Sequence, residues 1–87
     1  MELSQIDIKK HFAKFDIDIK FLQKNEFQKN ELFFLFELPK NFNPFENLKH
    51  QQNFKKSIRN IYIKNQFLDY CISGGKIEFF NFEYYEF

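Results

Sequence analysis

The pattern of hydrophobic and polar residues has two different periods along the chain, and the N-terminal segment has the period of a helix. Ile8 and Phe12 stand at i and i+4, while the lysines around them lie off that face. Ser4 is a favourable N-cap, and Asp7 three residues later completes a variant of the capping box. The pattern therefore predicts a helix over residues 3–15.

The period then changes to two. In FDIDIKFL, residues 15–22, apolar side chains alternate with charged ones up to Phe21, which predicts an edge strand with one solvated face. The polar stretch that follows repeats QKNE twice and indicates a hairpin loop. In ELFFLFEL, residues 31–38, the middle is apolar on both faces, as is typical of a central strand. Pro39 ends this strand, because proline cannot donate to the ladder.

A second helix is predicted from the residues after this strand. Asn43 is followed by Pro and, three residues on, by Glu, a combination that marks a helix start. Apolar residues at helical spacing continue to Ile72, with a break or kink expected near 50–53. The glycine pair at 74–75 would then end the helix. A competing interpretation makes NIYIKN, residues 60–65, a short strand.

The last segment, KIEFFNFEYYEF, predicts a third strand over residues 76–87. Successive side chains of a strand point to opposite faces, so both faces would carry rings. The set expected to face the core is Phe80, Phe82 and Tyr84. The set expected to face outward is Phe79, Tyr85 and Phe87.

These elements give the order α–β–β–α–β, in which the second helical region is one helix or two. We therefore expect a single small α+β domain, residues 1–87, with a three-stranded sheet covered by helices on one face. The order is similar to that of KH-like domains in nucleic-acid-binding and bacterial replication proteins, including helicase-loading factors. The GxxG loop of KH domains is absent, since SGGK at 73–76 differs in spacing and position. The resemblance implies a nucleic-acid-associated module.

Composition adds expectations about origin and location. The 87 residues include fifteen Phe and no Val, Thr or Trp, and Lys outnumbers Arg twelve to one. This usage predicts an AT-rich genome of a bacterium, a phage or another mobile element. No signal peptide and no apolar run of membrane-spanning length is evident. With Cys71 as the one cysteine, we expect a cytoplasmic protein with a reduced thiol.

The residues that could support catalysis are few. His11 and His50 are the only histidines, and neither belongs to a catalytic or metal-binding motif. Cys71 would lie in the last turn of the predicted helix as a buried, unreactive thiol. Asp16 and Asp18 share one strand face, which suits a divalent cation but is also typical of a solvated edge. We expect no enzyme, no cofactor, no metal and no small-molecule substrate.

Positive charge is concentrated in the middle of the chain. Residues 40–64 hold six basic residues and one acidic residue, a net charge of +5, whereas both flanks are net acidic. On a helical projection the basic residues share one side with two apolar residues, which indicates an interaction surface more than a purely solvated face. Together with the outward rings of the last strand, the predicted partner-binding residues are Lys49, Lys56, Arg59, Ile63, Lys64, Phe67, Phe79, Tyr85 and Phe87.

The sequence thus predicts a small non-enzymatic interaction module that binds a macromolecule. A protein partner is favoured, with self-association as a dimer as the simplest case, because the glutamates of the last strand repel a polyanion. Alternatives are a KH-like module associated with DNA or RNA, and an inhibitor of a host enzyme encoded by a phage or mobile element. A toxin-type ribonuclease is a weaker alternative, because Arg59 is the single arginine.

Overall fold

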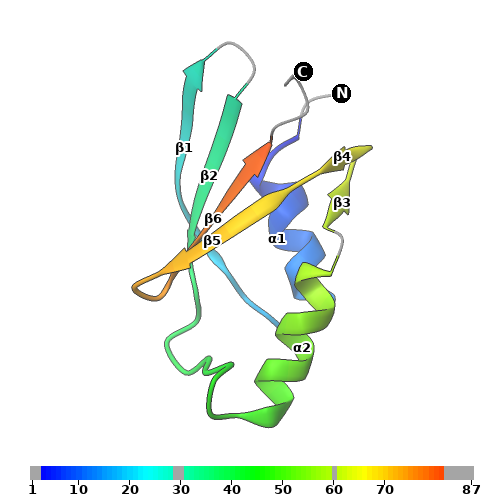
Figure 1. Cartoon of the computed structure of the whole chain (residues 1–87), viewed down its shortest axis with the longest axis vertical. Coiled ribbons are helices and arrows are strands. Elements are labelled where there is room, and N and C mark those ends of the chain that lie inside the picture. Colours follow the sequence, from blue (N-terminus) through cyan, green and yellow to red (C-terminus); the bar gives the residue numbers. More distant parts are fainter. Residues whose placement is uncertain (1–2, 29–30, 60, 82–87) are drawn as a thin grey trace.

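The computed structural model describes residues 3–28, 31–59 and 61–81, and in these ranges it contains two helices and six strands (Figure 1). The helices are α1 (Gln5–Ala13) and α2 (Leu48–Ile58). The strands are β1 (Lys20–Gln28), β2 (Glu31–Glu37), β3 (Tyr62–Ile63), β4 (Gln66–Phe67), β5 (Asp69–Ser73) and β6 (Lys76–Asn81). The α+β class is confirmed, but the order is α–β–β–α–β–β–β–β.

Four strands form one antiparallel sheet in the order β1-β2-β6-β5, and β3 and β4 pair separately as a hairpin. The sheet therefore has one strand more than the three expected, because the segment after α2 forms strands. β2 lies in the interior of the sheet, as predicted, and β1 lies at an edge. The helix α1 lies behind β5 and β6 in the view of Figure 1 and packs on one face of the sheet.

The core lies between α1 and the inner face of the sheet. Paired antiparallel residues share a face, so Phe34 and Phe79, which are partners on β2 and β6, point together toward α1. The ring of Phe79 lies 5.2 Å from that of Phe12 and 5.7 Å from that of Phe36. Around these rings the buried apolar residues are Leu3, Ile8, Ile17, Ile19, Phe54, Ile61, Leu68 and Ile77.

The capping box predicted for α1 is present. Asp7 N–H donates to Ser4 Oγ at 3.4 Å, and Ser4 N–H donates to Asp7 Oδ2 at 2.9 Å. The helix ends in a Schellman arrangement, in which Ile17 N–H donates to the Phe12 carbonyl at 3.1 Å. Asp16, at φ 59°, takes the left-handed position that this motif requires. The apolar residue after it, Ile17, is therefore turned back onto the core.

Because the helix cap occupies these residues, the first strand begins later in the chain than the sequence predicts. The prediction of a strand over 15–22 is wrong for residues 15–19, because Asp16 belongs to the helix cap and β1 begins at Lys20. The polar stretch expected to be a loop forms most of β1 instead. Its backbone pairs with β2 although its side chains are polar, since an edge strand needs main-chain hydrogen bonds more than apolar burial.

The second helix begins four residues later than the sequence predicts. Asn47 is its N-cap and accepts a hydrogen bond from His50 N–H at 3.0 Å. Asn43 caps a single preceding turn, accepting from the backbone N–H groups of Phe45 and Glu46 at 3.1 Å. The predicted capping interaction thus exists, but it closes one turn that leads into α2.

The helix ends at Ile58, far short of Ile72. The competing strand interpretation of 60–65 is confirmed for Tyr62–Ile63, where β3 forms. The glycine pair does not end a helix, because Gly74 and Gly75 have φ of 58° and 74° and close the β5–β6 hairpin. Cys71 consequently lies exposed on β5, contrary to the expected buried thiol.

In β6, the last described strand, the side chains that face the core and those that face outward are the reverse of those predicted. Phe79 was expected to face outward, but it is fully buried, and Phe80 is the half-buried residue of the outer face. The two-residue turn before β6 sets its register with β5, since it aligns Phe79 with Tyr70 across the ladder. Phe82, Tyr84, Tyr85 and Phe87 lie outside the described residues.

Candidate interaction surface

The β3–β4 hairpin presents two aromatic side chains to solvent. Tyr62 and Phe67 are cross-strand partners with 51% and 69% of their surface exposed. Their ring centroids are 4.5 Å apart at an interplanar angle of 39°. The Tyr62 hydroxyl donates to Asn65 Oδ1 at 3.2 Å, which orients the ring over the turn. The two rings therefore form one exposed apolar patch, named here the aromatic pair.

The opposite side of the hairpin is anchored in the core. Ile61 and Leu68 are buried, and Ile63 is half-buried against the same cluster. Leu68 N–H donates to the Ile61 carbonyl at 3.0 Å, which extends the hairpin ladder inward. Alternation of inward and outward residues thus holds the aromatic pair on the solvent side.

The tip of the hairpin is fastened to α1. Lys64 Nζ lies 3.1 Å from Asp7 Oδ2. The backbone hydrogen bond from Ser4, assisted by Lys64, holds the pKa of Asp7 below its ordinary value of 3.8. Lys64 and Asn65 themselves occupy the two turn positions, with φ of 51° and 64°. Of the predicted binding residues, Lys64 is therefore engaged within the domain.

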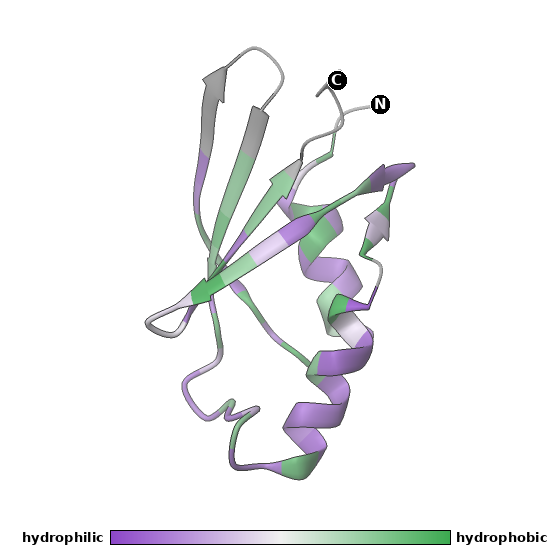
Figure 2. Cartoon of the chain, viewed as in Figure 1, coloured by the Kyte–Doolittle hydropathy of each residue, from purple (hydrophilic) through white to green (hydrophobic). Residues whose placement is uncertain are grey.

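The exposed side of α2 is basic. Phe54 and Ser57 are buried, whereas Lys49, Lys56 and Arg59 are exposed, as the helical projection predicted. The hydrophilic character of this helix is plain in Figure 2, beside the apolar strands. Arg59, the C-cap of α2, precedes Tyr62 by three residues, so the basic residues at the end of α2 are close in sequence to the aromatic pair. Lys55 adds a further exposed cation.

The structure brings some of the predicted binding residues together and separates others. Lys49 and Lys56 lie on α2, Arg59 is its C-cap, and Phe67 lies on the hairpin that follows. Phe79 belongs to the core, and Tyr85 and Phe87 lie outside the described residues. Tyr62 was not among the predicted binding residues. The sequence feature that could have identified Tyr62 is the Lys-Asn pair that separates Tyr-Ile from Gln-Phe in residues 62–67. Asn tolerates the left-handed backbone conformation that a two-residue turn needs.

Both histidines make hydrogen bonds that hold the fold. His11 Nε2 lies 2.7 Å from the carbonyl oxygen of Ser57, and His50 Nδ1 accepts from Asn43 N–H at 3.0 Å. The His50 ring also stacks on Phe42, with centroids 5.1 Å apart. Within residues 3–28, 31–59 and 61–81, no group of three His, Cys, Asp or Glu side chains is arranged to hold a metal ion. Asp18, one of the two carboxylates weighed as cation ligands, has its Oδ1 atom 3.9 Å from Lys9 Nζ.

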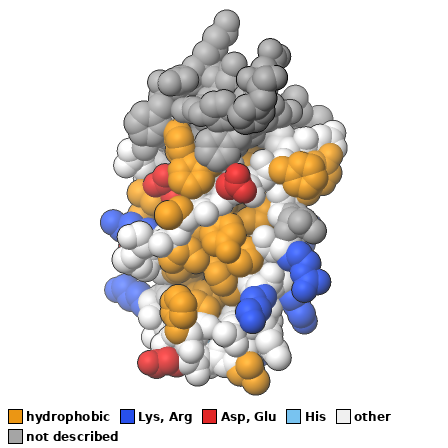
Figure 3. Space-filling view, viewed as in Figure 1, with side chains coloured by type: hydrophobic (Ala, Val, Ile, Leu, Met, Phe, Trp, Pro, Cys, Tyr) orange, Lys and Arg blue, Asp and Glu red, His pale blue; other side chains and the backbone are white. Residues whose placement is uncertain are grey.

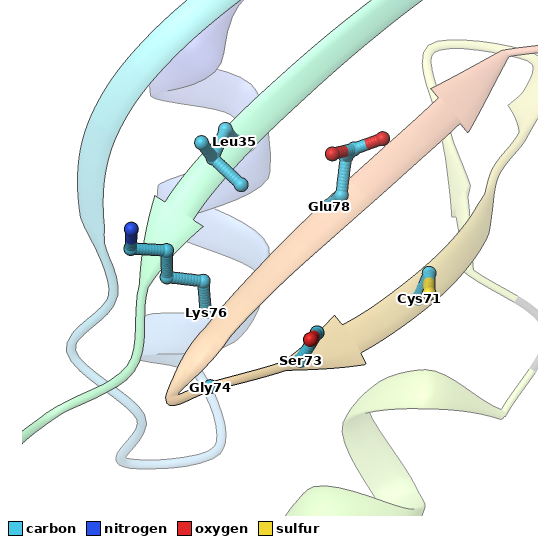
Figure 4. Close-up of a pocket in the computed structure, with 6 residues that line it drawn as sticks. All are labelled: Leu35, Cys71, Ser73, Gly74, Lys76 and Glu78. Carbon is cyan, nitrogen blue, oxygen red and sulfur yellow. The ribbon is translucent and has the colours of Figure 1, made fainter.

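The outer face of the sheet has a shallow pocket of about 390 Å³ near the β5–β6 turn. Figure 4 shows the residues that line it, which come from β2, β5, β6 and the turn between β5 and β6, and they are Leu35, Cys71, Ser73, Gly74, Lys76 and Glu78. In Figure 3, hydrophobic side chains occupy the middle of the visible face, and Lys and Arg side chains lie toward its left and lower right margins. This face combines apolar surface with charges of both signs.

Comparison of the chain with protein-family models, curated proteins and solved structures found no match. Among the helices described, none is long and apolar enough to cross a membrane.

Proposed function

We propose that this domain is a small non-catalytic module that binds a protein partner through the aromatic pair and the basic side of α2. The observation that supports this most is the exposure of Tyr62 and Phe67 side by side on an anchored hairpin. Aromatic residues are enriched in protein interfaces and supply much of their binding energy. Contiguous exposed apolar side chains mark interaction sites, whereas singly exposed apolar side chains are common on protein surfaces.

The charges beside the aromatic pair indicate the kind of partner surface that fits. Lys55 and Lys56 are exposed in the last turn of α2 and Arg59 is exposed at its C-cap, all close in sequence to Tyr62. A partner with an apolar pocket bordered by carboxylates would receive the rings and be steered by the cations. An enzyme of a host cell, inhibited by a protein from a phage or mobile element, is one class that meets this description.

Nucleic acid is the alternative partner, as the KH-like expectation implied. Exposed rings can stack on unpaired bases while cations contact phosphates. Protein is favoured because the rings of Tyr62 and Phe67 pack against each other and so offer one joint apolar surface. The ion pair with Asp7 also withdraws Lys64 from phosphate contact.

A non-catalytic role is supported by the engagement of both histidines in structural hydrogen bonds. A ribonuclease would need a histidine or similar group available for proton transfer, whereas His11 and His50 bond to backbone groups. The exposed thiol of Cys71 suits a reducing compartment such as the cytoplasm.

The test compares three immobilised proteins in extract of the source cells. The double variant Tyr62→Ser/Phe67→Ser removes the aromatic pair, and Phe45→Ser is the matched control, since Phe45 is 86% exposed on the loop before α2. We expect a protein retained by the wild type and by Phe45→Ser to be lost from the double variant. Retention by all three proteins would refute the role of the aromatic pair.

A second measurement separates protein from nucleic acid. Fluorescence anisotropy with single-stranded DNA and RNA oligonucleotides is recorded at low and physiological salt for the wild type and for Lys56→Ala/Arg59→Ala. The proposal predicts no binding that survives physiological salt. Binding that falls steeply with salt and with the double variant would instead establish the nucleic-acid alternative.

A further inference from the structure

The loop between β2 and α2 is held against the helix by the imidazole of His50. Asn43 N–H donates to His50 Nδ1 at 3.0 Å. The ring of Phe42 stacks on the same imidazole, with centroids 5.1 Å apart, and also meets the ring of Phe54 at 5.8 Å. Phe42, Asn43 and His50 are each half-buried, so this contact is partly shielded from water.

The direction of the hydrogen bond fixes the protonation state of this ring. A backbone N–H can only donate, so Nδ1 of His50 offers its lone pair and carries no proton. In the imidazolium form both ring nitrogens carry protons. Uptake of a proton at Nδ1 would therefore set two donors against each other and remove the bond. His11 differs, because its Nε2 faces a carbonyl oxygen and can donate in the neutral and in the charged form.

The position of His50 in α2 also disfavours a positive charge. His50 is the third residue after the N-cap Asn47, and its backbone N–H donates to the Asn47 side chain at 3.0 Å. The first turn of a helix carries a partial positive charge, which repels a cation. Lys49, the preceding residue, is a further positive group on the same helix.

The loop supplies charged groups of both signs. Lys40 is exposed, and Glu46, which would favour the imidazolium, has its Oε2 atom bonded to Asn43 Nδ2 at 3.0 Å. Tyr70 on β5 lies against Phe54 at 6.3 Å, and a phenol carries no charge at acid or neutral pH. The hydrogen bond from Asn43 is therefore the interaction that distinguishes the neutral ring from the charged one.

We propose that His50 is a pH switch, in which protonation of the imidazole releases residues 40–46 from α2. An imidazole of ordinary acidity takes up a proton near about pH 6.5. The closed loop binds the neutral ring, so its contact with α2 is complete above that pH and is lost progressively as the pH falls below it.

Release of the loop would open a pocket beside the sheet. Figure 1 shows the loop running from the end of β2, below the sheet, to the start of α2. A pocket of about 390 Å³ lies between this loop and the turn that joins β5 to β6, and among its lining residues are Phe42, Asn43, Pro44, Phe45, Ile72, Gly74 and Gly75. Leu38 N–H donates to the Gly75 carbonyl at 2.9 Å, which keeps the start of the loop on the turn. The movement is therefore confined to the residues after Pro39.

The first test measures the protection of the Asn43 amide against hydrogen exchange, by NMR, at about pH 7.5 and about pH 5, relative to an unstructured peptide at the same pH. His50→Asn keeps an oxygen acceptor in the place of Nδ1 but does not titrate, and His50→Phe keeps a ring but has no acceptor. We expect the protection in the wild type to fall about 3- to 10-fold at the lower pH. The Asn variant should stay protected at both pH values, and the Phe variant should be unprotected at both. An equal fall in His50→Asn would overturn the proposal, since His11 is then the only histidine left.

The second test uses the wild type alone, so it does not depend on how a variant folds. Nitrogen-15 spectra of the imidazole show whether Nδ1 of His50 carries a proton, and they are recorded over the same pH range as the exchange of Asn43. We expect Nδ1 to be unprotonated at neutral pH and the protection of Asn43 to fall in step with its protonation. A proton on Nδ1 at neutral pH, or protonation that leaves Asn43 protected, would contradict the switch.

The switch is independent of the proposed function, since it lies at the start of α2 and the aromatic pair follows its end. Tyr62→Ser/Phe67→Ser is expected to show the same fall in Asn43 protection as the wild type. Failure of the partner-binding test would leave this inference standing, and failure of the exchange test would leave the aromatic pair as the binding surface.

Discussion

The imidazole of His11 on α1 is bonded to the backbone of Ser57 in the last turn of α2, with Nε2 2.7 Å from the carbonyl oxygen. A carbonyl oxygen can only accept, so Nε2 carries the proton and donates. Carbonyl groups of the last helical turn have no partner within the helix, and Ser57 is fully buried from water. This bond therefore satisfies the end of α2 and fixes the point from which the β3–β4 hairpin departs.

Replacing this histidine should destabilise the domain. We expect His11→Ala to lower the free energy of unfolding by about 1–3 kcal/mol, because the buried carbonyl loses its donor. The ring contacts with Phe12 and Phe15, at 5.2 and 5.4 Å, would be lost as well. Urea denaturation measures the change, and Lys10→Ala on the same helix, an exposed residue, is the control expected to stay within about 0.5 kcal/mol of the wild type. Equal stability of His11→Ala and wild type would show that the bond contributes nothing.

Asp7 should make the stability depend on acid pH. Its pKa in the folded chain lies below its ordinary value of 3.8, mainly through the Ser4 backbone hydrogen bond. The carboxylate therefore stabilises the fold above that ordinary value, and this contribution is lost as the pH falls through the lower, folded-state pKa. We expect the wild type to lose more stability than Asp7→Asn between about pH 5 and about pH 2, as urea unfolding would show. Parallel pH profiles would mean that Asp7 has no such role.

The cap itself can be tested at neutral pH. Ser4→Ala removes the acceptor for Asp7 N–H and is expected to cost about 0.5–2 kcal/mol. Ser4→Asn keeps an oxygen acceptor at the N-cap and should cost much less. Thermal or urea unfolding of the two variants gives the comparison. A Ser4→Asn variant as unstable as Ser4→Ala would point away from capping as the cause.

The turn between β5 and β6 requires residues that tolerate positive φ. Gly75→Ala places a Cβ at φ 74°, and since no neighbouring atom lies within 4 Å, backbone strain alone is expected to cost about 1–2 kcal/mol. Gly74→Asn should cost little, because Asn is favoured at the first position of such turns. Chemical unfolding of both variants tests this. If Gly75→Ala were as stable as wild type, the turn would not be of this type.

The register of β6 predicts which of two adjacent rings matters for stability. Phe79 is fully buried and Phe80 is half-buried on the other face, beside Phe33 at 4.8 Å. Phe79→Ala is expected to cost about 3–5 kcal/mol, and Phe80→Ala markedly less. Phe79→Leu serves as a milder variant if the alanine protein does not fold. A larger loss for Phe80→Leu than for Phe79→Leu would reverse the assignment of faces.

Local signals in the sequence were sufficient where short-range contacts decide the structure. Ser4 and Asp7 are three residues apart and form the capping box that their types predict. The apolar middle of β2 likewise identified a strand paired on both sides. The exposed basic residues of α2 followed from the helical period alone.

The remaining features depend on contacts between distant segments. Ile61 and Leu68 fit the spacing of a helix as well as that of strands, and only burial in the core selects the hairpin. The faces of Phe79 and Phe80 are fixed by the position of the turn, and shifting the register by one residue exchanges them. β1 has no apolar pattern in its polar half and becomes a strand because β2 offers a ladder.

The proposed binding surface depends on one structural assignment, that residues 61–73 form the strands β3, β4 and β5 instead of a continuation of α2. Two-dimensional NOE spectroscopy tests this most directly. Tyr70 and Phe79 are cross-strand partners, and the direction of their backbone groups makes them a non-hydrogen-bonded pair, in which the Cα protons are close. We predict strong Hα–Hα contacts between Tyr70 and Phe79 and between Ile72 and Ile77. Contacts from residue i to i+3 throughout 61–72, with no cross-strand Hα–Hα contact, would contradict the account.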